Sequence, residues 1–163
     1  MQSKEASWLR LGVWGLLGAI GGLAAGEGPF VNAPLRLRDG WQELVPGLYR
    51  PPAGGGWEAR LGVRMIEEDP ATARLRLQEA WTTMFEALAI LDDDALPLGG
   101  RVWQRLRVQY RIADLPWEQT AWIGRVGPRT LMLVLAHAAD ADPREGWRAE
   151  IEAVLGALPA VTP

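Results

Sequence analysis

The chain has 163 residues, of which 48% are hydrophobic and 23% are charged, so it can bury one ordinary core and is too short for two domains. The formal net charge is −3, and because residues 1–26 hold Lys4, Arg10 and Glu5, the rest of the chain carries −4, which argues against nucleic acid as the main partner. Cysteine is absent, which excludes a disulfide framework, a thiolate metal site, a cysteine nucleophile and acylation of a lipoprotein cysteine.

An uncharged apolar run extends over residues 11–26, after Lys4 and Arg10. At about 1.5 Å per residue, this run spans roughly 24 Å, which is shorter than a hydrocarbon core of about 30 Å. Adding Trp8 and Leu9 brings it to a marginal full span. Trp8 and Trp14 are suited to the membrane interface. We therefore predict a retained single transmembrane helix, with its positive residues on the cytoplasmic side.

This prediction divides the chain into a membrane anchor at residues 1–26, a linker at 27–34 and an extracytoplasmic domain at 35–163. The alternative is a cleaved signal peptide, for which Ala24 and Gly26 would supply the small residues of the cleavage site. Both alternatives place the domain on the periplasmic side of the membrane.

Glycine is dense in the hydrophobic segment. On a helix, one face carries Gly15, Gly18, Gly22 and Gly26. A smooth face lets another helix or a flat cofactor approach closely, so we predict that these glycines pack against a partner in the membrane. The alternative is a passive anchor that tolerates glycine.

Short strands are predicted at residues 35–38 and 47–50, followed by a longer strand at 57–66 in which apolar and charged residues alternate. Asp69 and Pro70 then begin a helix to about residue 91. Its core stripe consists of Leu77, Trp81, Met84, Leu88 and Leu91.

The second half predicts strands at residues 101–113, 117–126 and 130–137, the last apolar on both faces and therefore central. Asp142 and Pro143 begin a final helix, which Pro159 ends and whose apolar stripe is Trp147, Ile151, Val154 and Leu158. The order of elements predicts an α+β domain in which two helices cover an antiparallel-rich sheet.

Four segments of this domain are informative: DGWQEL at 39–44, LGGRVWQRLRVQYRI at 98–112, WEQTAWIGRVGPRTLMLVLAHA at 117–138 and WRAEIEAVLGAL at 147–158. Together they resemble the PsbP-like family, which is named for an extrinsic protein of photosystem II. The resemblance covers roughly residues 35–160. It implies a non-catalytic attachment or assembly aid for a larger membrane complex, such as a photosynthetic reaction centre or antenna complex. The chain is shorter than the photosystem protein, so no role in oxygen evolution is implied.

Catalytic motifs are missing. Ser3 and Ser7 are the only serines, so the predicted domain has no serine nucleophile. A single histidine, His137, ends a buried strand and is interpreted as structural, because one imidazole cannot build a histidine-rich zinc site. Two acidic clusters, at 67–69 and 92–94, lack the spacing of a calcium loop and are interpreted as solvated loops or caps. We predict no cofactor, no metal and no enzymatic activity.

One face of the strand at 101–111 is the surface that we single out. Its alternate positions carry the candidate interface residues Arg101, Trp103, Arg105, Arg107 and Arg111. Clustered arginine with tryptophan is a common interface composition. The alternative is a solvated sheet face whose arginines pair with acids of neighbouring strands such as Glu58 and Glu118.

The sequence therefore favours a membrane-anchored accessory subunit that stabilises or helps assemble an integral membrane protein complex. The first alternative is a tethered or secreted binding module for a small apolar ligand, lipid or pigment, which a large apolar cavity under the helices would support. An enzyme of unknown type is the third hypothesis.

Overall fold

The computed structural model describes residues 35–52, 59–140 and 146–159. The predicted anchor with its four glycines, the linker, Glu58 and the capping pair Asp142 and Pro143 lie outside these residues. In the part of the chain that is described, no helix is long and apolar enough to cross a membrane.

Seven strands form one sheet in which every pair of neighbours is antiparallel. The strands are β1 (Gln42–Val45), β2 (Leu48–Arg50), β3 (Ala59–Ile66), β4 (Glu86–Leu98), β5 (Arg101–Ile112), β6 (Leu115–Val126) and β7 (Arg129–Ala138). They lie in the order β1-β2-β3-β7-β6-β5-β4. Strand β7 occupies the middle and is buried on both faces, as its sequence predicted.

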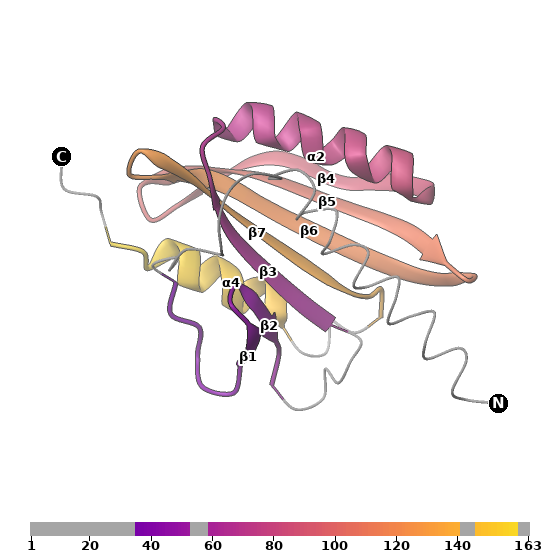
Figure 1. Cartoon of the computed structure of the whole chain (residues 1–163), viewed down its shortest axis with the longest axis horizontal. Helices are drawn as coiled ribbons and strands as arrows, with labels where there is room; N and C mark the ends of the chain where they lie inside the picture. The colour runs from indigo at the N-terminus through magenta and orange to yellow at the C-terminus, as the bar shows by residue number, and fades with distance from the viewer. Residues whose placement is uncertain (1–34, 53–58, 141–145, 160–163) are drawn as a thin grey trace.

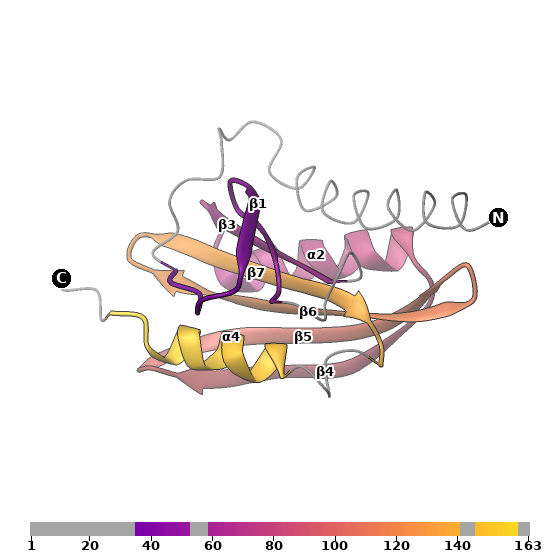
Figure 2. The same ribbon diagram turned by 90° about the horizontal axis from the view of Figure 1, so that it is seen from below.

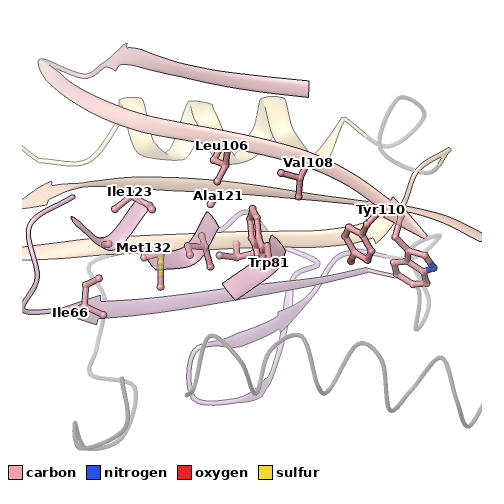
Figure 3. Close-up of a cluster of buried hydrophobic side chains, with 12 residues drawn as sticks. Ile66, Trp81, Leu106, Val108, Tyr110, Ala121, Ile123 and Met132 are labelled. Carbon is pink, nitrogen blue, oxygen red and sulfur yellow. The ribbon is translucent and has the colours of Figure 1, made fainter. Parts of the chain in front are cut away.

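Helices α2 (Pro70–Met84) and α4 (Trp147–Gly156) pack on opposite faces of this sheet, as Figure 1 shows. Beneath α2 lies a cluster that includes Trp81, Leu106, Val108 and Tyr110 (Figure 3). The cluster beneath α4 is built around Trp103, Trp122, Leu133, Ile151 and Leu155. The predicted antiparallel sheet with two helices is confirmed, and the domain has three layers.

Local chemistry explains the start of α2. Asp69 is the N-cap residue, and its side chain accepts a hydrogen bond from the backbone N–H of Thr72 at 3.1 Å. The threonine hydroxyl donates to the same carboxylate at 2.6 Å. These hydrogen bonds hold the pKa of Asp69 below its usual value, because they favour the charged form.

The predicted end of this helix is wrong. Helix α2 stops at Met84, and Leu88 and Leu91 belong to β4, an edge strand that pairs with β5. Alanine, leucine and glutamate favour a helix locally, but pairing with β5 and packing onto the core override that preference. Phe85, just before β4, stacks on Tyr110 with ring centroids 4.0 Å apart.

The first predicted strand is also wrong. Residues 35–38 pair with no strand, and β1 begins only at Gln42. The alternation that suggested a strand is nevertheless present. Leu35 and Leu37 pack against the cluster beneath α4, whereas Arg36 and Arg38 are exposed. Hydrophobic burial on one side therefore produces the same pattern as a strand.

The expected alternation of β5 reverses at its start, where Val102 is 59% exposed and Trp103 is fully buried. The reason is that α4 covers the start of β5 on the Trp103 face. Gly124 of β6 makes room for the indole, since a Cβ added there would lie 2.7 Å from Trp103 Cε3. Which residues of a strand are buried thus depends on where each helix lies.

Helix α4 begins after Gly146, whose φ of 69° favours glycine, and it ends at Gly156, before the predicted stop at Pro159. Its buried side chains are Trp147, Ile151 and Leu155. Val154, which we expected in the buried stripe, is only half-buried and lines a surface groove instead.

Candidate functional site

The arginines that we predicted at an interface are mostly bound within the domain. Arg105, Arg107 and Trp103 lie on the α4 face of β5, and the ring of Trp103 is in the core rather than on the surface. Arg111 donates a hydrogen bond to the carbonyl of Asp114 at 2.9 Å, within the turn between β5 and β6.

Arg105 joins three elements. Its guanidinium donates to both carboxylate oxygens of Asp94 on β4, at 2.9 and 2.7 Å, and to Glu152 of α4 at 3.0 Å. The indole N–H of Trp122 on β6 donates to the same Glu152 oxygen at 3.2 Å. Hydrogen bonds to Asp94 are the main cause that raises the pKa of Arg105, and those to Glu152 add to it, although partial burial opposes them. This arginine is a bridge from the edge strand to the helix.

Arg107 lies next to two buried polar side chains, Glu118 and His137, and is in contact with the first of them. It donates to Asp92 at 2.8 Å, and its Nε lies 3.5 Å from Glu118 Oε2. Glu118 is only 7% exposed, and its Oε2 lies 3.9 Å from Nε2 of the fully buried His137. The His137 ring meets the edge of Trp147 with centroids 5.9 Å apart. The positive charge of Arg107 therefore offsets two carboxylates, one of them almost out of solvent.

Arg101 caps the end of α4. Its guanidinium donates to the carbonyl of Leu158 at 3.2 Å and to that of Pro159. Carbonyls that follow the last helical turn have no partner inside the helix, so an arginine is a suitable donor. Arg101, Arg105 and Arg107 thus all fasten other elements to β5.

The sequence reasoning missed the acids that hold these arginines. Asp92, Asp93 and Asp94 were interpreted as a loop or cap, yet they lie on β4. Asp92 and Asp94 face the β5 arginines, whereas Asp93 points to the other face and binds Arg74 of α2. The period-two alternation of a strand separates them, and recognising β4 would have predicted this pairing. The alternative with Glu118 as an acid partner agrees with the Arg107 contact.

A groove of about 820 Å³ lies between the start of the described domain and the end of α4. One side is formed by Leu35, Arg36 and Arg38, and the other by Ala153, Val154, Ala157, Leu158 and Pro159. Figures 1 and 2 both show the indigo start of the domain beside the yellow end of α4. The helix wall is apolar, and the facing segment carries two exposed cations.

These two cations differ from the other arginines that the structure describes. Arg36 and Arg38 make no hydrogen bond or ion pair, whereas each remaining described arginine makes at least one. The sequence analysis gave neither residue a role. Their signal was the alternation of leucine and arginine over 35–38, which we interpreted as a strand.

No group of three or more histidine, aspartate or glutamate side chains in the described ranges could hold a metal ion. What the groove offers is an apolar wall next to two unpaired guanidinium groups. This combination is chemically suited to an anionic group that carries an apolar part.

Neither a protein-family model nor a curated protein matches the chain. Solved structures do. PA94, a protein of unknown function from Pseudomonas aeruginosa, is similar with a TM-score of 0.56 and 15% identity, over 78% of this chain and 92% of PA94. A protein from Bacteroides thetaiotaomicron gives a TM-score of 0.50 and 13% identity, over 78% of this chain and 44% of that protein.

The solution structure of the cyanobacterial PsbP (CyanoP) from Synechocystis gives a TM-score of 0.50 and 13% identity, over 79% of this chain and 95% of CyanoP. At such low sequence identity, these structural similarities support a shared fold and not a shared role. They agree with the resemblance found in the sequence, and the described part of the chain has a PsbP-like fold.

Proposed function

We propose that the chain is a non-catalytic accessory subunit that binds an integral membrane protein complex from the extracytoplasmic side and stabilises it or assists its assembly. The groove between residues 35–38 and the end of α4 is the observation that carries this proposal. Ala153, Ala157 and Pro159 of its wall are exposed, and its two arginines have no partner among the described residues, so these side chains are available to a partner protein.

The position of the groove supports attachment close to the membrane. In this proposal residues 1–26 are the anchor and residues 27–34 the linker. A linker of that length spans at most about 28 Å even when fully extended. Leu35 lines the groove, so the proposed anchor would hold the groove within about that distance of the bilayer.

The fold is compatible with this role, since CyanoP shares it. A photosynthetic reaction centre or antenna complex would be a partner of the proposed kind. The β5 arginines have a different task in this proposal, because Asp92, Asp94 and Glu152 already hold them. They keep β4 and α4 in place, and α4 supplies one wall of the groove.

The alternative function is a binding module for a small apolar ligand, lipid or pigment. The size of the groove favours it, since about 820 Å³ falls within the usual range of roughly 300–1,000 Å³ for small-molecule sites. The groove lies at the surface beside α4 rather than beneath a helix.

The test is purification of the full chain from its native membranes in a mild detergent, with identification of the proteins and lipids that accompany it. Ala153→Glu places a carboxylate on the groove wall, and Ala149→Glu makes the same change one turn earlier on α4, outside the groove. Both alanines are exposed, so neither change should unfold the domain.

We expect the wild type and Ala149→Glu to retain the same membrane proteins and Ala153→Glu to lose most of them. If both variants retained the membrane proteins equally, the groove would not be part of the attachment site. Recovery of a small molecule without any protein would favour the alternative function.

A further inference from the structure

We propose that the groove binds an anionic phospholipid, whose phosphate is held by Arg36 and Arg38 and whose hydrocarbon lies along α4. The proposal rests on the proposed function in one respect, namely that the anchor keeps the groove near the bilayer. It goes further by naming the class of ligand that the groove takes.

The two arginines are placed to grip one anionic group. Leu35 and Leu37 pack against the cluster beneath α4, whereas Arg36 and Arg38 are exposed and both line the groove. Alternate residues of an extended chain are about 6.6 Å apart, a separation that two long side chains can close. The planar guanidinium group matches two phosphate oxygens at once, which makes arginine well suited to phosphate.

The opposite wall is suited to hydrocarbon. Ala153 and Val154 in the last turn of α4 and Ala157 just after it offer small apolar side chains. The nearly buried Leu158 and the exposed Pro159 extend this wall beyond the helix. A polar ligand would gain nothing from this wall. An acyl chain would remove it from water, which is favourable in proportion to the apolar area buried.

The end of a helix carries a partial negative charge, which would repel a nearby phosphate. Arg101 offsets this charge here, because it donates to the carbonyls of Leu158 and Pro159 at the end of α4. Arg36 and Arg38 therefore line the groove without a partner in the described chain, and Arg101 is bonded to the carbonyls of two other residues that line it.

Phospholipid is the anionic amphiphile that a short linker brings within reach of Arg36 and Arg38. An acidic, apolar segment of a protein could in principle meet the same side chains, so the experiment has to separate the two. It uses the full chain in an uncharged detergent, with phosphatidylglycerol added and bound lipid counted by native mass spectrometry. Phosphatidylcholine is the zwitterionic comparison.

The test variant is Arg36→Gln with Arg38→Gln. The matched control is Arg111→Gln with Arg125→Gln, which removes the same charge from exposed arginines that donate only to main-chain carbonyls in turns. Lys4 and Arg10 stay constant in every variant, so any lipid that they attract cancels in the comparison. Equal thermal midpoints would show that both variants are folded.

We expect wild type and control to bind phosphatidylglycerol in preference to phosphatidylcholine, and the Arg36 and Arg38 variant to bind it at least tenfold more weakly. Free glycerol phosphate should not compete at the same concentration, because it lacks the hydrocarbon. Equal binding by the two variants, equal binding of the two lipids, or full competition by glycerol phosphate would each overturn the proposal.

The outcome separates this proposal from the proposed function. Lipid binding in the groove without any co-purified complex would contradict the accessory role and leave the lipid site standing. Loss of the complex with unchanged lipid binding in the Arg36 and Arg38 variant would show that the arginines meet an acidic protein segment, and the lipid proposal would fail.

Discussion

The arginines of β5 and those of residues 36–38 have the same local pattern, alternating with apolar side chains, but their surroundings differ. Arg105 and Arg107 lie opposite Asp94 and Asp92 in register with β4, and each forms an ion pair there. Arg36 and Arg38 lie in no strand and form no ion pair with a described residue. The same residue type is therefore structural in one region and free for a ligand in the other.

This difference shows how to choose between a structural and a functional interpretation of surface arginines. A guanidinium that already bonds two carboxylates has few donors left, and removing it leaves those acids unpaired. An exposed guanidinium without a partner costs the fold little when it is replaced. Stability and ligand binding should therefore respond in opposite ways in the two regions.

The largest effect should follow Trp103→Ala. Trp103 sits among the β5 arginines in sequence but is fully buried, so truncation should lower the free energy of unfolding by about 3–5 kcal/mol, measured by urea denaturation. Val102→Ala is the control, since Val102 is 59% exposed and should change stability by no more than about 0.5 kcal/mol. Similar small losses for both variants would mean that Trp103 is not a core residue.

Arg107→Ala should destabilise the domain by about 2 kcal/mol, because Glu118 and Asp92 would lose their shared cation and Glu118 is nearly buried. The matched change is Arg111→Ala, where only a main-chain carbonyl loses its partner and the expected loss is below about 0.5 kcal/mol. Chemical denaturation of both variants measures this difference. If the two losses were equal, the Arg107 contacts would not support the fold.

Gly99→Ala tests the junction of β4, β5 and α4 without removing a charge. Gly99 has a φ of 60°, and a Cβ there would lie 2.5 Å from the carbonyl oxygen of Gly156, at the end of α4. We expect a loss of about 1–2 kcal/mol in the free energy of unfolding. Gly100 also has a positive φ, but a Cβ added there would meet open space. Gly100→Ala should therefore lower the free energy of unfolding less than Gly99→Ala does, as measured by thermal denaturation. If Gly100→Ala were the more destabilising of the two, the turn at Gly99 would not be in close contact with the end of α4.

The smallest effect on stability should come from Arg36→Gln with Arg38→Gln. Both side chains are exposed and have no partner among the described residues, so the free energy of unfolding, measured by thermal denaturation, should change by no more than about 0.5 kcal/mol. A loss comparable to that of Arg107→Ala would show that these arginines support the fold, and the contrast between the two regions would disappear.

The sequence by itself determined the features that depend on short-range chemistry. Alternation indicated the strands β3 and β5, the run at 130–137 indicated a strand buried on both faces, and Asp69 with Pro70 indicated the start of α2. Each of these signals is complete within a few residues, because side-chain direction and helix capping follow from the local backbone.

Only the tertiary structure decided which surfaces these elements share. The segment after Met84 has helix-forming residues but becomes β4, because β5 offers it a strand to pair with. Trp103 is buried and Val102 exposed because α4 covers that end of the sheet. The ion pairs of Arg105 and Arg107, and the unpaired state of Arg36 and Arg38, likewise depend on contacts between residues far apart in the chain. Local periodicity cannot specify such contacts, since it gives the direction of a side chain but not what lies opposite it.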